Sequence, residues 1–377
     1  MSQTGYPAAK LAAPRIRFHL ERHLRDVAEQ RGTKFEVPDP ASVEAMIEAA
    51  FWASLRREEG FVPRISLALV APEAVKQPLR FERRLALAAQ PLSRLAPAVE
   101  RPGTHIGVWR DSGELVVWGA TRDVPPFCLV LEVIAPGLLV VKHSRHESEK
   151  FANLAVLQGD EIKVIDESAT DLPDCPELLA LLLGDKRHLA SNESASLLIR
   201  LAISMRTHGR GGSLLVVPAE TGQWRESIVR PVSYSVVPPF SALTELIQSH
   251  DARSADPIWA DALQSVIEAV GGLTAVDGAT VISDAYEVLA FGAKIVRREG
   301  SSQVGDVLIT EPIEGVRAHV ADPGQLGGTR HLSAAQFVHD QHDAVALVAS
   351  QDGRFTVFAW SPCEKIVHAH RIESLLL

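Results

Sequence analysis

The sequence predicts an α/β protein in two parts, an α+β first half and a second half with a mixed central sheet flanked by helices. Its 377 residues exceed what one ordinary hydrophobic core contains. Two helical segments are followed, after residue 60, by short β-rich runs punctuated by Gly and Pro. Beyond residue 190, runs typical of strands alternate with runs typical of helices. We therefore expect one domain at residues 1–190 and a second at residues 191–377.

The first half opens with two amphipathic segments. Residues 14–31 carry apolar side chains at helical spacing, and residues 40–57 begin with a proline suited to the first turn of a helix. The segment Asp111-Ser112-Gly113 has the composition of a hairpin turn. In a largely antiparallel sheet we expect strands at 64–70, 105–110, 114–118, 127–134, 138–143 and 151–165.

The second half follows a polar, proline-bearing segment at residues 166–193, with one short helical run at 177–183. This segment places the domain boundary near residue 190. A proline-rich connection passes through Pro238-Pro239. The expected helices are 194–207, 241–250, 257–270 and 333–338, and the expected strands are 213–217, 280–282, 344–349 and 355–360, with a strand or turn at 287–290.

Composition and charge exclude several classes of protein. The net charge is −9, and no run of Lys and Arg is longer than two residues, so a nucleic-acid partner is not expected. Cys128, Cys175 and Cys363 are widely spaced and odd in number, which argues against a disulfide framework and fits a reducing cytoplasm. The longest apolar stretch, residues 127–141, is interrupted by Glu132, so we expect no membrane span.

Two short segments carry the residue types that hold a nucleoside triphosphate. Asp277-Gly278-Ala279 places a carboxylate, which can hold a divalent cation, at the entrance of an apolar strand. The segment 327–331 (GGTRH) combines a glycine turn with a hydroxyl, a guanidinium and an imidazole, which suit phosphate oxygens. It also leads into the helix expected from Ser333, whose N-terminus favours an anion. Taken alone, each segment is more typical of an ordinary solvated turn than of a binding site.

Other segments of the sequence argue against several familiar kinds of site. The glycine-rich segment 208–212 (HGRGG) precedes a strand, whereas a dinucleotide-binding GxGxxG follows one, and no GxxxxGK[ST] phosphate loop occurs. No GxSxG element supports a serine hydrolase. His339 and His342 could face one ion from a helix, but no third ligand stands at a recognisable spacing, which favours a polar helix end over a zinc site.

Taken in order, three segments resemble the diadenylate cyclase (DisA nucleotide-binding) domain. VDGATVISDAYEVLAFGAKI and GGTRHLSAAQFVHDQHDAVALVASQDGRFTVFAW resemble its DGA and RHR motifs, and HGRGGSLLVVP resembles the glycine-strand segment before them. This resemblance covers about residues 190–362. In the first half, FWASLRREEG after an amphipathic helix resembles the DACNV type of sensor domain, which is fused ahead of such cyclase domains.

The resemblance implies a nucleotidyltransferase that condenses two ATP molecules into cyclic di-AMP and releases pyrophosphate, under control of the sensor domain. It implies two active sites meeting face to face in a homodimer or higher homo-oligomer. Asp277 would bind Mg²⁺ or Mn²⁺ and help activate the ribose 3′-hydroxyl, and Arg330 and His331 would act on the phosphates and the departing pyrophosphate. The implied nucleotide contacts are Gly211, Gly212, Gly278, Ala279, Gly328 and Thr329.

The chain departs from the family pattern at several positions. Leu332 replaces the second arginine of RHR, and Val276 stands where the family often has His. Ser350-Gln351-Asp352 replaces an acidic SEE segment, which makes Asp352 a candidate metal ligand. A weakly active cyclase, a cyclase with another nucleotide choice, a sensor that binds a nucleotide or cyclic dinucleotide without turnover, and a scaffold that binds no nucleotide therefore all remain as interpretations.

Overall fold

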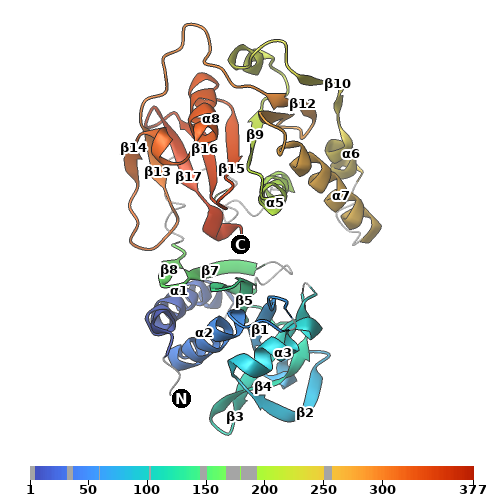
Figure 1. Ribbon diagram of the computed structural model, residues 1–377, viewed down its shortest axis with the longest axis vertical. Helices are drawn as coiled ribbons and strands as arrows, with labels where there is room; N and C mark the ends of the chain where they lie inside the picture. Colours follow the sequence, from blue (N-terminus) through green and yellow to red (C-terminus); the bar gives the residue numbers. More distant parts are fainter. Residues whose placement is uncertain are drawn as a thin grey trace. The chain divides into compact units, whose positions relative to one another are not determined.

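The computed structural model describes residues 5–31, 37–58, 60–101, 103–144, 151–166, 179, 193–249 and 257–377 (Figure 1). The chain divides into two compact units, Met1–Asp166 with Leu377, and Glu167–Leu376. The described residues form one mixed sheet of eight strands, one of nine, and seven α-helices, which confirms the mixed α/β class. The boundary expected near residue 190, and the helical run expected at 177–183 apart from residue 179, lie outside the described residues.

The first unit is an eight-stranded sheet in the order β2-β4-β3-β1-β5-β6-β7-β8. Within it, β1 and β3 are parallel and the other paired neighbours are antiparallel. The strands are β1 Ile65–Leu69, β2 Leu79–Ala86, β3 His105–Asp111, β4 Glu114–Thr121, β5 Leu129–Ala135, β6 Leu138–Ser144, β7 Phe151–Gln158 and β8 Glu161–Val164, and the helices are α1 Pro7–Arg31, α2 Pro40–Ser54 and α3 Ala89–Val99.

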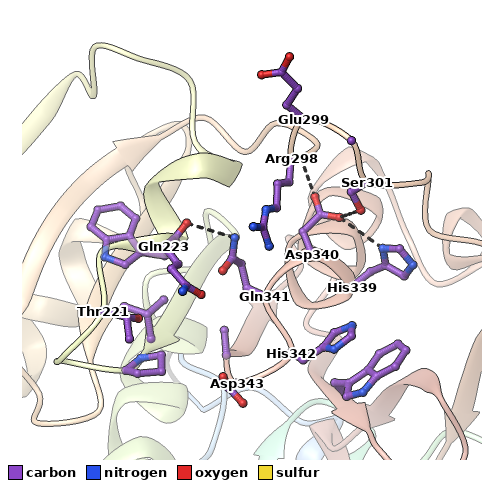
Figure 2. Close-up of a pocket in the computed structure, with 16 residues that line it drawn as sticks. Thr221, Gln223, Arg298, Glu299, Ser301, His339, Asp340, Gln341, His342 and Asp343 are labelled. Atoms are coloured by element: carbon purple, nitrogen blue, oxygen red, sulfur yellow. Dashed lines mark hydrogen bonds and ion pairs between the residues drawn. The ribbon is translucent and has the colours of Figure 1, made fainter.

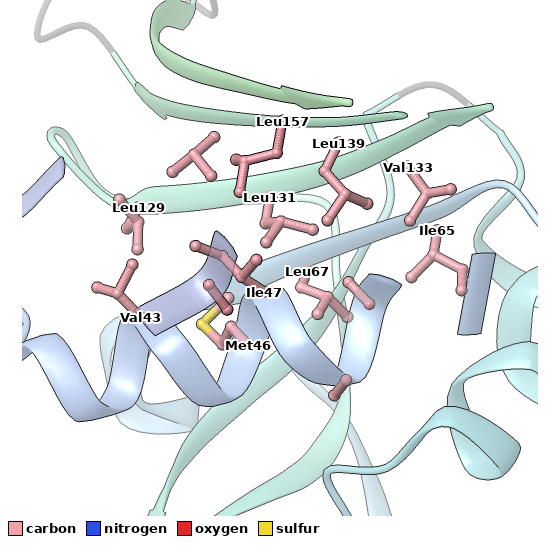
Figure 3. Packing of buried hydrophobic residues seen from close by; sticks show 14 of the residues in the cluster. Val43, Met46, Ile47, Ile65, Leu67, Leu129, Leu131, Val133, Leu139 and Leu157 are labelled. Atoms are coloured by element: carbon pink, nitrogen blue, oxygen red, sulfur yellow. The ribbon is translucent and has the colours of Figure 1, made fainter. Parts of the chain in front are cut away.

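One face of this sheet packs against the three helices. Because successive residues of a strand point to opposite faces, Ile65 and Leu67 of β1 share the helix side with alternate residues of β5. Figure 3 shows these side chains against Val43, Met46 and Ile47 of α2. Ser66 and Ala68 therefore belong to the opposite face.

The second unit is a nine-stranded sheet in the order β10-β12-β11-β9-β15-β16-β17-β13-β14. Strand β9, inside this sheet, is parallel to β11 and antiparallel to β15. The strands are β9 Gly212–Val217, β10 Tyr234–Phe240, β11 Ala279–Ser283, β12 Val288–Ala293, β13 Val307–Thr310, β14 His319–Ala321, β15 Val345–Ala349, β16 Phe355–Ser361 and β17 Ile366–Arg371, and the helices are α5 Glu193–Thr207, α6 Ala242–Gln248, α7 Pro257–Leu273 and α8 Thr329–Asp340.

Helices pack on this second sheet through alternate strand residues. Phe337 and Val338 of α8 share one buried cluster with Leu215, Val281 and Phe358. The intervening strand residues, such as the fully buried Ile282 and Leu347, point to the other face. Helices α5 and α7 pack against each other and contact β15 and β12 respectively (Figure 1).

Several elements differ from the sequence predictions. The sequence did not predict the largely exposed edge strand β2, helix α3, or strands β13, β14 and β17. Residues 151–165 form the β7–β8 hairpin, not one strand, because the chain turns at Gly159, where φ is +61°. The expected proline-rich connection contains β10, an edge strand whose pairing shifts register between Ser235 and Phe240, so its prolines interrupt no regular ladder.

The structure also addresses the predicted hairpin turn and the question of a membrane span. Asp111 pairs with Glu114 across the β3–β4 hairpin, so the predicted turn at Ser112-Gly113 is confirmed. Among the described residues, no helix is both long enough and apolar enough to cross a membrane.

We predict that His370 makes the second unit lose stability in acid. The side chain is fully buried, its Nδ1 lies 2.7 Å from Oγ1 of Thr310, and burial lowers its pKa to about 3. An unfolded histidine titrates near 6.5, so this contribution is complete above that pH and is lost as the pH falls towards 3. Between pH 7 and 5 the wild type should lose about 2 kcal/mol more than His370→Gln in urea unfolding. Equal losses would contradict the prediction, and exposed His319→Gln should behave as the wild type.

Candidate functional site

The pairing of β9 brings three separate segments to one end of the second sheet. Ser213 of β9 pairs with Ala279 of the parallel strand β11, and Gly212 pairs with Ala349 of the antiparallel strand β15. The residues before β9, the residues before β11 and the residues after β15 therefore lie at the same end. These are three of the segments in which the sequence predicted site residues.

Arg330 joins the start of α8 to the same end of the sheet. A Cβ atom on Gly211 would lie 3.1 Å from Nη1 of Arg330 and 3.2 Å from the carbonyl oxygen of Ala349. Nε2 of Gln351 also donates a hydrogen bond to the carbonyl of Arg210, at 3.2 Å. The glycine-rich segment, the first turn of α8 and the turn after β15 thus meet around one guanidinium.

Asp277 is an ionised carboxylate beside two cations. Its side chain is 88% exposed, and Oδ2 accepts a 2.5 Å hydrogen bond from Nζ of Lys294. That bond, then the charge of Lys294, and more weakly the charge of Arg330, hold the pKa of Asp277 below its ordinary value. The carboxylate is therefore charged at neutral pH and lies within the electrostatic range of Arg330.

Lys294 was not identified from the sequence. It follows the β11–β12 hairpin, in which Ala279 pairs with Ala293, so that it lies opposite the DGA turn. Two register shifts within this hairpin prevent the pairing from being counted along the sequence. A hairpin assignment for residues 279–293 is the signal that could have found it.

Gly278 allows the DGA turn to pack against the neighbouring strand. Its φ is +116°, and a Cβ atom there would lie 2.4 Å from the carbonyl carbon of Gly292 and 2.9 Å from the amide nitrogen of Ala293. Only glycine avoids both the strained conformation and the backbone overlap. Its role in the structure is to hold Asp277 at the sheet edge, and Ala279, which follows it, is buried at the start of β11.

Helix α8 begins earlier than expected, at Thr329 and not at Ser333. Thr329-Arg330-His331 is therefore the first turn of the helix. Gly328 is the N-cap and no side chain caps the helix, while Gly328 and Thr329 are exposed with open space around Gly328. Uncapped amides at a helix N-terminus favour an anion.

His331 lies beneath this turn. The residue is 2% exposed, its ring packs edge-on to Phe358, and a Cβ atom on Gly327 would lie 2.4 Å from its Nδ1. Burial lowers the pKa of His331, and among the described residues its Nε2 has no hydrogen-bond partner. The imidazole is thus neutral and buried, in contrast to the half-buried Arg330.

Gly212 serves packing in this structure. A Cβ atom there would lie 2.4 Å from the carbonyl oxygen of Thr274, so the start of β9 fits closely against the end of α7. Nδ1 of His208 accepts from the amide of Arg210 at 3.1 Å, which leaves Nε2 to donate to Oγ1 of Thr274 at 3.0 Å. These contacts hold the glycine-rich segment in place.

Asp352 is engaged within its own turn. Its carboxylate forms an ion pair with Nε of Arg354 at 3.4 Å and accepts from the Arg354 amide at 3.3 Å. A hydrogen bond from Ser350, and then its contacts with Arg354, lower the pKa of Asp352. In the described part of the chain, no three His, Cys, Asp or Glu residues are grouped so that they could hold a metal. A cation bound by the carboxylates at this end of the sheet would therefore need further ligands of another kind.

A concavity of about 700 Å³ lies at the opposite end of this sheet, beside the end of α8 (Figure 2). The buried carboxylate of Asp340 accepts hydrogen bonds from the Arg298 amide at 2.8 Å and from Oγ of Ser301 at 2.5 Å, which fixes the adjacent loop. The ring of His342 stacks on Trp360 at 3.8 Å, and that of His339 is edge-on to Trp360. The two histidines thus flank one indole.

Comparison with known proteins concerns mainly the first unit. Residues 33–122 match the family described as "Probable sensor domain DACNV". No curated protein is significantly similar to the chain. A solved structure described as the hypothetical membrane spanning protein from Bacillus cereus is similar at 17% identity, over 51% of this chain and 71% of that one, with a TM-score of 0.28. That likeness is too distant to carry an argument, so the sensor-domain match is the functional finding.

We predict that Gly278→Ala disrupts the site and Gly272→Ala does not. The first change forces a residue with a side chain to φ near +116° against the Gly292 backbone, which should cost about 3 kcal/mol. At Gly272, in the last turn of α7, no atom lies within 4 Å of the new methyl group, and a gain of up to about 1 kcal/mol is expected. Urea unfolding of both variants measures the difference. Similar stabilities for the two variants would contradict the packing described for Gly278.

Proposed function

We propose that the second unit is a nucleotidyltransferase of the diadenylate cyclase type, controlled by the sensor domain of the first unit. The observation that carries this proposal is the convergence of three sequence-distant motifs. Arg330 lies against Gly211, and after Lys294 its charge contributes weakly to the lowered pKa of Asp277, so an anion-binding and a cation-binding group face one region. Motifs in solvated turns unrelated in function would have no reason to meet there.

ATP fits this arrangement through its phosphates. The guanidinium of Arg330 and the uncapped start of α8 are positioned to hold phosphate oxygens. Gly328 leaves open space for the close approach of a ligand. The neutral His331 supports the turn from beneath and holds no positive charge of its own.

In the proposed reaction, the 3′-hydroxyl of one ATP attacks the α-phosphorus of a second ATP. An O–P bond forms, the bond between the α- and β-phosphates breaks, pyrophosphate leaves, and the hydroxyl proton is lost to solvent. Repeating the step closes cyclic di-AMP. Because each site holds one ATP, two chains must meet face to face, as a homodimer or within a higher homo-oligomer. Catalysis of this kind rests on positioning and charge neutralisation.

The residues present fit a divalent cation that is held jointly with the nucleotide. Mg²⁺ usually takes one or two carboxylates, and its other ligands are phosphates and water. The ionised Asp277 supplies one carboxylate, and Asp352 is the second candidate. Mg²⁺ or Mn²⁺ bound there would supply charge neutralisation for the triphosphate. Lys294 would have to release the Asp277 oxygen that the cation uses.

A second function, binding without turnover, is favoured by two observations. Lys294 already neutralises Asp277, and Leu332, which is 37% exposed on α8, leaves the start of the helix with one arginine instead of two. A site of this kind would bind a nucleotide or a cyclic dinucleotide and report on it. The two functions differ in whether pyrophosphate is released.

We predict that the full-length protein forms cyclic di-AMP from ATP with Mn²⁺ or Mg²⁺, and that Asp277→Asn lowers the rate at least a hundredfold. The amide lacks the charge that a cation requires. Asp306→Asn is the matched control, because Asp306 is exposed before β13, which begins at the other end of the sheet. Mass spectrometry of the product measures the rate. Binding of ATP with no product from a dimeric protein would overturn the cyclase and support the second function.

We predict that Leu332→Arg increases product formation by at least tenfold. The change adds a cation one residue beyond His331, where a departing pyrophosphate could be neutralised. Ile203→Arg on α5 is the control, since Ile203 is also an exposed apolar residue of a helix. Both rates are measured at equal protein concentration. An unchanged rate in Leu332→Arg would show that Leu332 does not limit turnover.

A further inference from the structure

The sheet of the first unit has a face that none of its described helices covers. The helices pack on the side of Ile65, Leu67 and their neighbours (Figure 3). On the other side, a small apolar cluster contains Ala68 and Val130. Ser66 pairs directly with Glu132, and Lys142 with Val130, so these polar residues share this second face.

A cavity of about 930 Å³ lies on this face. Small-molecule sites in proteins have volumes of roughly 300–1,000 Å³. The cavity spans the ends of β1, β3 and β5 and the adjoining parts of β6 and β7. It therefore belongs to the first unit alone and overlaps the part that matches the sensor-domain family.

A polar cluster, defined here as Ser66, His105, Glu132 and Lys142, lines the cavity. Nζ of Lys142 lies 2.7 Å from Oε1 of Glu132, and the side chains are only 12% and 27% exposed respectively. Oγ of Ser66 lies 2.7 Å from Nδ1 of His105, which is almost fully buried and whose pKa burial lowers to about 4. Such groups are costly to bury, and apolar residues would serve packing better.

Phe151 adds an apolar surface to the polar cluster. Nζ of Lys142 lies 4.5 Å from the centre of the Phe151 ring, and the His105 ring is edge-on to the same ring at 5.9 Å. The cavity wall thus combines one aromatic ring, a neutral imidazole and a lysine. These groups suit the carbon skeleton and polar atoms of an organic molecule.

Three exposed arginines also line the cavity. Arg64, Arg101 and Arg122 are exposed, and none of them forms an ion pair with any described residue. Three acidic residues also line the cavity: Glu132 is paired with Lys142, Asp123 accepts the Lys76 amide at 3.1 Å, and Glu100 is exposed. Four cationic side chains against three carboxylates leave the lining with one net positive charge in a chain with a net charge of −9, which favours an anion.

We propose that this cavity binds a small organic anion bearing two or more carboxylate or phosphate groups. Arg64, Arg101 and Arg122 hold the anionic groups, and the polar cluster with Phe151 contacts the remainder of the molecule. The carboxylate and phosphate forms share this chemistry because a guanidinium presents paired donors to either group. The inference rests on the first unit and does not require the second to be a cyclase.

The test is a calorimetric titration of the full-length protein at low salt with citrate and, separately, with inorganic pyrophosphate. Glucose is the uncharged control. We expect at least one anion to bind with one site per chain, and the double variant Arg101→Gln/Arg122→Gln to weaken its Kd at least tenfold. The matched control is Arg56→Gln/Arg83→Gln, which removes two exposed arginines of the same unit from outside the cavity. It should bind as the wild type does.

The variant Arg330→Gln distinguishes binding in the cavity of the first unit from binding at the proposed nucleotide site of the second unit. If the anion binds in the cavity, Arg330→Gln should bind it as tightly as the wild type does. If pyrophosphate binds at the proposed nucleotide site instead, Arg330→Gln should no longer bind it. Citrate binding alone identifies a carboxylate ligand, and pyrophosphate binding alone a phosphate ligand. The proposal is overturned if neither anion binds at millimolar concentration, if both arginine double variants weaken binding equally, or if only Arg330→Gln abolishes it. If the protein forms no cyclic di-AMP but still binds the anion in the cavity, the proposed cyclase function is contradicted and the inference about the cavity stands.

Discussion

The pairing of β9 between β11 and β15 is the constraint on which the candidate site depends. Ser213 faces Ala279 and Gly212 faces Ala349, so Gly211, Asp277 and the turn after β15 reach the same end of the sheet. Strand side chains alternate between faces, so a shift of one residue would move every buried side chain to the wrong side. The hydrophobic core of the second unit thereby also determines the alignment of the polar residues at its edge. Helix α8, packed on the same strands, adds Arg330 to this edge.

The glycines of the candidate site divide into two groups by what surrounds them. At Gly212, Gly278 and Gly327 the space of a side chain is already taken by other parts of the protein, so these residues permit close packing. At Gly328 the space is open, and at Gly211 it is bordered by Arg330. The glycine-rich motifs therefore contain some positions that close packing requires and others where a side chain would have room. Both groups consist of glycine, so the residue type alone does not separate them. The contacts within the fold do.

In the first unit, the alternation of strand side chains between the two faces of the sheet separates an apolar face from a polar one. Alternate residues of its strands bury an apolar face beneath the helices, and the intervening ones place charged and polar side chains around a cavity. Lys142 and Glu132 remain stable there because each neutralises the other at 2.7 Å. A sheet covered by helices on one side, with a cavity on the other, suits the family match to a probable sensor domain.

The sequence by itself determined the class of fold, most central strands and the DGA and GGTRH motifs, because apolar periodicity and turn residues are local signals. It did not predict β2, whose largely exposed edge position weakens the apolar pattern, or the start of α8 at Thr329. Only the tertiary structure decided that Lys294 pairs with Asp277, that Arg330 lies on Gly211 and that His331 is buried. These contacts join residues distant in the chain or depend on bulged strand register and on packing against the sheet, and no local pattern encodes such information.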